Sequence, residues 1–97
     1  MRRVLLSPDA LRQLRALRAH DQRLLQAALI EQLQDADAAE ETRNRFRLRR
    51  PSAAADYELR VRELRAFYRV AGTQVQVVMI GRKVGNQLFV DGRRFVL

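Results

Sequence analysis

The chain has 97 residues, of which 47% are apolar, and this fits a single domain over residues 1–97 with one small hydrophobic core. Its 19 basic residues outnumber the 11 acidic ones, so the net charge is +8. A chain with this charge attracts phosphate backbones, anionic membranes or acidic partner proteins. Cysteine is absent, which excludes disulfides, thiol nucleophiles and thiolate metal sites.

The basic residues are almost all arginines, and Lys83 is the only lysine. Arginine binds phosphate through paired hydrogen bonds and stacks on bases, so this bias is compatible with a nucleic-acid target. A GC-rich genome would produce the same bias.

No stretch of the sequence approaches the roughly 18 apolar residues that cross a bilayer. The segment before Ser7 is also shorter than the apolar region of a signal peptide, which needs about 7 to 15 residues. We therefore expect a soluble, cytoplasmic protein.

The N-terminal part of the sequence predicts one strand and two helices. Residues 3–6 form a short apolar segment that suits a strand, and Ser7 followed by Pro8 is a typical helix start. Leucines then recur at helical spacing, and the pattern restarts near Asp21, which we expect to cap a second helix. Two consecutive helices of this kind predict an antiparallel helical hairpin.

The remaining sequence predicts antiparallel strands. Residues 43–50 favour a strand, and Pro51-Ser52 marks a turn after it. Residues 75–80 are almost wholly apolar, as expected for a central strand buried on both faces. Asp91-Gly92 favours a tight hairpin turn because both residues accept positive φ. The fold class predicted by these patterns is α+β.

Residues 57–83 carry arginines at alternate positions along two consecutive predicted strands. Since successive side chains of a strand point to opposite faces, the first strand places Tyr57, Leu59 and Val61 on one face. Its other face carries Glu58, Arg60 and Arg62. The second strand divides in the same way, with Ala66, Tyr68 and Val70 opposing Arg65, Phe67 and Arg69. A hairpin turn at Glu63-Leu64 would bring both arginine sets to one face.

A basic face with aromatic rings can bind a nucleic acid, or it can simply solvate the open side of a sheet. Cleavage of RNA without a metal needs more: a group that takes the 2′-hydroxyl proton, cations around the phosphate, and a proton donor for the leaving 5′-oxygen. Arginine suits only the second role because its pKa of about 12.5 keeps it protonated. Lys83 or a tyrosine of lowered pKa is the better proton carrier. The single histidine, His20, lies between the helices, and we expect it to be structural or exposed.

These features resemble the RelE/ParE superfamily of toxins from bacterial type II toxin–antitoxin systems. The resemblance covers nearly the whole chain and is carried by SPDALRQL, YELRVRELRAFYRV and IGRKVGNQLFVDGRRF. It implies a helical hairpin packed on a curved antiparallel sheet, here of about four to five strands. RelE-type members cut mRNA in the ribosomal decoding site, ParE-type members inhibit DNA gyrase, and an antitoxin holds both inactive.

The resemblance also implies roles for individual residues. Catalytic roles fall on the residues that would hold and activate the scissile phosphate, Arg60, Arg65 and Lys83. RNA-binding roles fall on Arg62, Arg69, Arg82, Phe67 and Phe89. Two positions depart from the RelE pattern: Glu58 replaces a lysine, and Phe89 replaces a tyrosine and so carries no exchangeable proton. Glu58 can serve either as a general base or as the ion-pair partner of an arginine.

We therefore expect a toxin that arrests growth as a ribosome-dependent mRNA endoribonuclease, with no cofactor and no metal. Its expected partners are the ribosome, mRNA and an antitoxin whose acidic or amphipathic segment covers the helical hairpin and approaches the basic face. Two alternatives stay open: a non-enzymatic inhibitor of DNA gyrase, and a degenerate toxin that acts only in an antitoxin–repressor complex.

Overall fold

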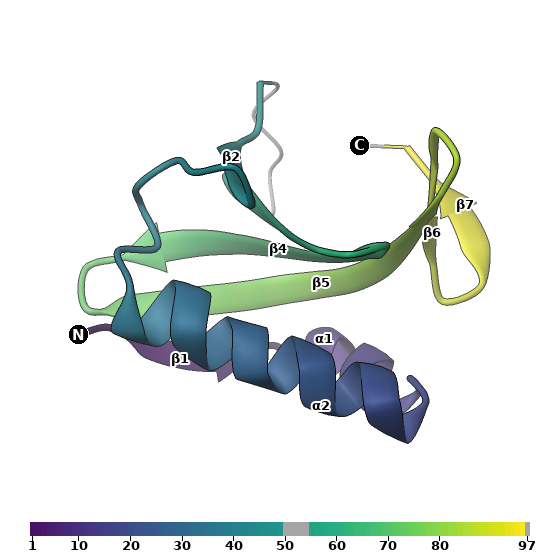
Figure 1. The fold of residues 1–97 in the computed structure, drawn as a ribbon, viewed down its shortest axis with the longest axis horizontal. Helices are drawn as coiled ribbons and strands as arrows, with labels where there is room; N and C mark the ends of the chain where they lie inside the picture. The colour runs from purple at the N-terminus through teal and green to yellow at the C-terminus, as the bar shows by residue number, and fades with distance from the viewer. Residues whose placement is uncertain (50–54, 97) are drawn as a thin grey trace.

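The computed structural model describes residues 1–49 and 55–96 and shows an α+β fold in which helices cover one face of an open sheet (Figure 1). The first elements are β1 (Arg3–Leu6), α1 (Pro8–Arg15), α2 (Ala19–Ala28) and a π-helical continuation of α2, η1 (Leu29–Asp35). The strands that follow are β2 (Arg45–Arg47), β3 (Tyr57–Val61), β4 (Leu64–Ala71), β5 (Gln74–Val84), β6 (Gln87–Val90) and β7 (Arg93–Phe95). The predicted α+β class is confirmed.

All seven of these strands belong to one sheet, in the order β2-β3-β4-β5-β6-β7, with β1 joined in parallel to β5. The other neighbours pair antiparallel. Strand β5 pairs with β4 along one edge, and two strands share its other edge, since β1 pairs with residues 74–77 and β6 with residues 82–84. The expected count of four to five strands is too low because β2 and β7, of three residues each, extend the sheet at its two ends.

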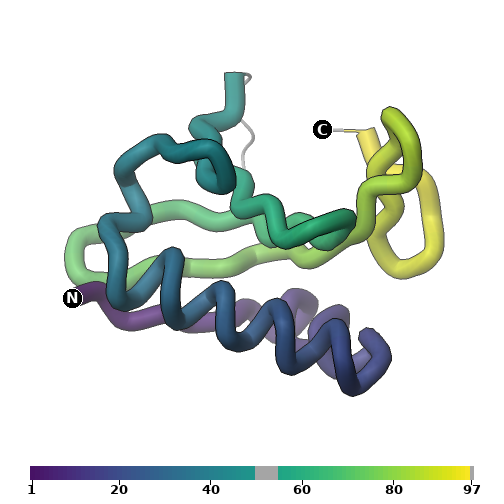
Figure 2. Tube along the Cα trace, in the orientation of Figure 1, coloured from purple at the N-terminus to yellow at the C-terminus, as the bar shows by residue number. Residues whose placement is uncertain are grey.

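The sheet curves away from the helices. Figure 1 shows α1 and α2 on one side of β4 and β5, while β2 and the β6–β7 hairpin rise on the other side. The chain trace in Figure 2 follows the same bend. We call the side turned away from the helices the concave face; it carries Glu58, Arg60, Arg65, Phe67 and Leu88. We call the opposite side the helix face.

The helical hairpin begins as predicted but restarts differently. The hydroxyl of Ser7 accepts a hydrogen bond from the amide of Ala10 at 3.0 Å, and Pro8 opens α1. The second helix starts three residues earlier than expected, with Arg18 rather than Asp21 at its N-cap. The predicted capping role of Asp21 is wrong because its buried carboxylate lies inside the first turn and accepts a hydrogen bond from Arg82.

The main core lies between the helices and the helix face of the sheet. Its fully buried side chains include Leu25, Leu33, Leu59, Tyr68, Val75 and Val77. Tyr68 stacks on Tyr57 with ring centroids 5.2 Å apart, and its hydroxyl donates a hydrogen bond to the carbonyl of Ala38 at 2.8 Å. The predicted division of the two strands into an apolar face and a basic face is confirmed except at Arg62, which lies in the turn between them.

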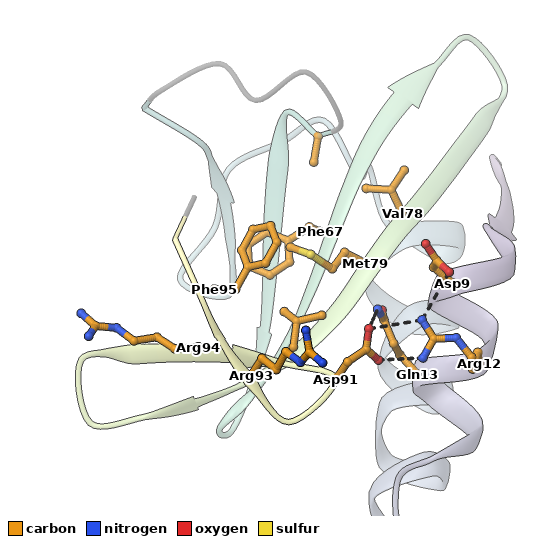
Figure 3. A pocket seen from close by; sticks show the side chains of 12 residues that line it. Asp9, Arg12, Gln13, Phe67, Val78, Met79, Asp91, Arg93, Arg94 and Phe95 are labelled. Carbon is orange, nitrogen blue, oxygen red and sulfur yellow. Dashed lines mark hydrogen bonds and ion pairs between the residues drawn. The ribbon is translucent and has the colours of Figure 1, made fainter.

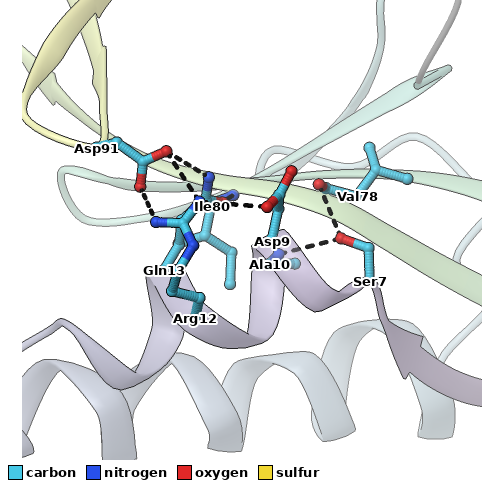
Figure 4. Close-up of polar contacts among 8 residues, drawn as sticks. All are labelled: Ser7, Asp9, Ala10, Arg12, Gln13, Val78, Ile80 and Asp91. Atoms are coloured by element: carbon cyan, nitrogen blue, oxygen red, sulfur yellow. Dashed lines mark hydrogen bonds and ion pairs between the residues drawn. The ribbon is translucent and has the colours of Figure 1, made fainter.

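A β-bulge in the central strand connects the sheet to α1. Val78 is the extra residue, since Phe67 pairs with Met79 while Tyr68 pairs with Val77. The hydroxyl of Ser7 donates to the carbonyl of Val78 at 3.0 Å, and the side-chain oxygen of Gln13 accepts from the amide of Ile80 at 2.7 Å (Figure 4). Helix α1 therefore satisfies backbone groups that the irregular strand leaves open.

Two turns decide which side chains reach the concave face. The turn between β3 and β4 consists of Arg62 and Glu63, one residue earlier than predicted, because Leu64 is buried and opens β4. Arg62 takes φ 56° there, so it leaves the strand face on which alternation had placed it. The turn at Asp91-Gly92 is confirmed, with φ of 55° and 73°. The turn expected at Pro51-Ser52 lies outside the described residues.

Within residues 1–49 and 55–96, no helix is long and apolar enough to cross a membrane.

Candidate functional site

The concave face brings together the three residues to which catalytic roles were assigned. Arg60 of β3 is directly opposite Arg65 of β4, and Arg65 is opposite Gly81 of β5. Lys83 lies two residues beyond Gly81, and therefore on the same face, as a diagonal neighbour of Arg65. We call Arg60, Arg65 and Lys83 the cation row.

A single carboxylate draws the two arginines of this row together. The Nε atom of Arg60 lies 2.6 Å from Oε2 of Glu58, and Nε of Arg65 lies 3.7 Å from the same oxygen. Glu58 and Arg60 both belong to β3, and Arg65 belongs to the neighbouring strand β4; all three side chains lie on the concave face. The geometry matches the ion-pair role considered for Glu58, and it also shows that both guanidinium groups can reach one oxyanion.

Arg60 is the more accessible of the two arginines. Its side chain is 44% exposed, and its guanidinium carbon stands 4.2 Å from the centre of the Phe46 ring. Phe46 belongs to β2 and is opposite Glu58. A cation stacked on a ring is held in orientation without losing its contact with solvent.

Arg65 is held more tightly. Its side chain is only 12% exposed, and Nη1 donates to the carbonyls of Arg62 at 2.5 Å and Leu64 at 2.9 Å. Burial lowers the pKa of Arg65, and the neighbouring Arg60 acts in the same direction, whereas Glu58 opposes them. A guanidinium stays protonated at neutral pH even so, which makes Arg65 a fixed positive charge in the floor of the face.

Lys83 completes the row from β5. Its amide donates to the carbonyl of Glu63 at 2.7 Å, which ties this part of β5 to the β3–β4 turn. The residue is half-buried and lines a cavity of about 270 Å³ with residues of the C-terminal hairpin, among them Leu88 and Phe95.

Arg82 and Phe89 lie on the helix face, away from the cation row. The guanidinium of Arg82 binds Asp21 at 2.9 Å and Glu63 at 2.8 Å. The hydrogen bond from Arg82 is the main cause that lowers the pKa of Asp21, and the same bond raises the pKa of Arg82. Phe89 is opposite Arg82 and lines a cavity beside α1.

The other predicted RNA-binding residues are spread out. Arg62 is exposed in the β3–β4 turn, and Arg69 is half-buried on β4, four residues from Arg65. Phe67 does face the concave side but is 1% exposed, within an apolar cluster that includes Leu88 and Val90. Its ring offers no open surface to a base in this conformation.

The tyrosines considered as proton carriers point to the helix side. Burial raises the pKa of Tyr68, whose hydroxyl donates to a backbone carbonyl, so this group keeps its proton. The Tyr57 hydroxyl accepts a hydrogen bond from Arg47 at 3.1 Å. His20 is exposed near the start of α2. Among the described residues, no cluster of histidine, aspartate and glutamate could hold a metal ion.

Sequence reasoning missed a cavity of about 600 Å³ that lies between the concave face, the β6–β7 hairpin and residues 9–13 of α1. Its apolar lining includes Phe67, Val78, Met79, Val90 and Phe95 (Figure 3). Phe95 lies on the concave face because it pairs with Leu88 of β6, and this pairing cannot be deduced from alternation within one strand.

A polar latch holds the hairpin that forms one wall of this cavity. The carboxylate of Asp91 accepts two hydrogen bonds from Arg12, at 2.8 and 3.2 Å, and one from the side chain of Gln13 at 3.2 Å (Figure 4). These contacts lower the pKa of Asp91 and raise that of Arg12. The latch fixes the β6–β7 turn against α1.

Comparison of the chain with family models, curated proteins and solved structures gives no match. The resemblance to RelE/ParE toxins therefore stays a prediction.

Proposed function

We propose that the concave face binds the phosphate backbone of RNA and that the chain is a RelE/ParE-type toxin that cleaves mRNA on the ribosome in the cytoplasm. The observation that carries the proposal is the convergence of Arg60 and Arg65 on one carboxylate oxygen, with Lys83 beside them on the same face. A phosphate oxygen that took the place of that carboxylate oxygen would meet both guanidinium groups.

The same residues supply each part of a metal-independent cleavage. Glu58 takes the proton of the 2′-hydroxyl, whose oxygen attacks the adjoining phosphorus, while Arg60 and Arg65 stabilise the added negative charge. The ammonium of Lys83 gives a proton to the leaving 5′-oxygen. The new O2′–P bond and the broken P–O5′ bond yield a 2′,3′-cyclic phosphate and a free 5′-hydroxyl.

The proposal is tested by adding the purified protein to a translating extract and mapping the 5′ ends of the mRNA. New ends at fixed codon positions are expected, and Arg60→Ala should reduce their rate of formation about a hundredfold, as for other lost transition-state contacts. Arg15→Ala on the exposed side of α1 is the matched control and should leave the rate unchanged. Intact mRNA despite growth arrest would reject the nuclease.

A second candidate is a non-enzymatic inhibitor of DNA gyrase. It is favoured by the position of Phe89, which takes the place of a RelE-type tyrosine and faces the helices rather than the cation row. In that case the protein reduces supercoiling by purified gyrase and leaves mRNA intact. A degenerate toxin that acts only with its antitoxin would show no toxicity when expressed alone.

The antitoxin proposed as partner has an acidic or amphipathic segment. A net charge of +8 and an open cation row favour a cover of opposite charge.

A further inference from the structure

We propose that the cavity lined by Phe67, Met79 and Phe95 is a nucleobase subsite. It would hold the base of a nucleotide whose phosphate lies on the cation row, so the inference rests on the proposed function for its phosphate contact. The aromatic ring available to this base is Phe95, not Phe67 or Phe89, to which the resemblance gave RNA-binding roles.

The cavity lies next to the cation row. Phe67 in the cavity floor is opposite Glu58 of β3 and Met79 of β5, whereas Arg65 is opposite Arg60. Phe67 in the floor therefore lies two residues along β4 from Arg65, roughly 7 Å away. Phe95 is opposite Leu88, which is opposite Lys83, so the wall of the cavity shares a cross-strand row with Lys83. A nucleotide can therefore extend from the Lys83 end of the cation row into the cavity, with its phosphate on Lys83 and its base against Phe95.

The walls of the cavity are apolar and aromatic on the side of the sheet. Phe67, Val78 and Met79 form an apolar floor, and Phe95 stands beside them with 42% of its surface exposed (Figure 3). A partly exposed ring and a thioether suit the flat face of a base, because stacking needs no particular hydrogen-bonding pattern. Arg93 adds a guanidinium at the rim, while Figure 3 shows Arg94 pointing away.

The cavity is formed before any ligand binds. The latch from Arg12 and Gln13 to Asp91 fixes the β6–β7 turn. Gly81 lets β6 cross closely, since a Cβ atom at that position would lie 2.7 Å from the carbonyl oxygen of Phe89. A wall that is fixed before binding costs the ligand little ordering entropy, and a volume of about 600 Å³ is typical of small-molecule sites.

Charge selects the occupant. At the rim, the two carboxylates of Asp9 and Asp91 are balanced by Arg12 and Arg93, so the excess positive charge near the cavity is that of the neighbouring cation row. A suitable ligand thus joins a flat apolar group to an anion one sugar away, which describes a nucleotide. An acidic peptide with an apolar side chain is the competing occupant, and the experiment below includes it.

The test compares ligands that differ by one part, using ¹H–¹⁵N NMR titrations of the whole chain. The four nucleoside 5′-monophosphates are compared with ribose 5-phosphate, which lacks the base, and with adenosine, which lacks the phosphate. At least one monophosphate should bind roughly five- to a hundredfold more tightly than ribose 5-phosphate, the range expected for one stacked base. Phe95→Ala should abolish this gain, and Phe95→Leu should retain part of it. Val84→Ala, at an apolar residue outside the cavity that is 58% exposed, is the control and should retain the full gain.

The two proposals fail in different ways. Equal binding of the monophosphates and ribose 5-phosphate, both weakened by Arg60→Ala, would overturn the base subsite and leave the phosphate row standing. Adenosine binding that depends on Phe95, with no binding of ribose 5-phosphate, would support the subsite and reject the cation row as a phosphate site. Shifts near Phe95 caused by a short acidic leucine peptide, but by no nucleotide, would overturn the subsite in favour of a protein partner.

Discussion

Two arginines on neighbouring strands show how differently the faces of the sheet hold the same side chain. Arg45 of β2 turns toward the helices, where the residue is 4% exposed and donates to the carbonyls of Gln32 at 2.7 Å and Glu40 at 3.0 Å. Arg60 of β3 turns to the concave face, keeps 44% of its side chain exposed and pairs with Glu58. Arg45 is fixed by backbone carbonyls, whereas Arg60 pairs with one carboxylate and stacks on the Phe46 ring.

The difference follows from desolvation. A charge next to the helices has lost its water and must be satisfied entirely by protein groups, so its removal leaves those groups without partners. The Arg60 charge on the concave face still has water around it and can exchange its carboxylate partner for a ligand at small cost. We therefore expect substitutions on the helix face to change stability, and substitutions on the concave face to change binding.

The largest effect expected from this comparison is the loss of Arg45. Arg45→Met keeps the length of the side chain but leaves buried carbonyls unpaired, which should lower the free energy of unfolding by about 3 kcal/mol. Urea denaturation measures the loss. Arg43→Met, two residues earlier and exposed, is the control and should change stability by less than about 0.5 kcal/mol. Similar losses for both variants would contradict the proposed contrast between the faces.

A smaller and pH-dependent effect is expected at Asp21. Its pKa is lowered chiefly by the hydrogen bond from Arg82, so the ionised carboxylate stabilises the fold at neutral pH. This contribution is lost as the pH falls through the folded-state pKa, below the usual value of 3.8. Asp21→Asn should therefore lower the urea midpoint at pH 7, and the difference from the wild type should shrink by pH 3.

Asp35→Asn is the control for this series, because Asp35 is an exposed residue at the end of η1. It should leave the midpoint unchanged at pH 7. A difference between the wild type and Asp21→Asn that stays constant from pH 7 to pH 3 would show that the ion pair with Arg82 does not stabilise the fold.

Local patterns predicted the parts of the fold that depend on local chemistry. Ser7 and Pro8 start α1, Asp91-Gly92 turns with positive φ, and period-two alternation separates the apolar face of β3 from its basic face. Each of these features is decided by residues within one turn or one strand. They therefore required no knowledge of which strands pair.

The features that the sequence did not predict depend on contacts between distant segments. Asp21 reads as a helix cap until Arg82, 61 positions away, takes its carboxylate. Phe67 reads as an exposed ring on a basic face until the β6–β7 hairpin covers it. The cavity beside Phe95 likewise exists only because Asp91 is held against α1. Alternation assigns a side chain to a face, but not what lies against that face.

The smallest expected change is a gain in RNA binding on substitution of Glu58, and this substitution separates binding from cleavage. Arg60 and Arg65 both face its carboxylate, so in the unbound protein this group competes with a phosphate for the two guanidiniums. Glu58→Gln removes that competitor and one negative charge, which should strengthen RNA binding by a few-fold, the equivalent of about 1 kcal/mol or less for a partly exposed pair. Fluorescence anisotropy with a labelled oligoribonucleotide measures this gain, and Glu31→Gln, exposed on η1, is the matched control.

Cleavage should respond to Glu58→Gln in the opposite direction. Because the glutamine amide cannot take the 2′-hydroxyl proton, a general base at this position requires the cleavage rate to fall even as binding strengthens, by about 10²- to 10⁴-fold. If the rate instead rises together with affinity, Glu58 only holds the arginines and another group takes the proton. If Glu58→Gln binds RNA no more tightly than Glu31→Gln does, the Glu58 carboxylate does not compete with RNA for Arg60 and Arg65. The phosphate would then lie elsewhere on the concave face.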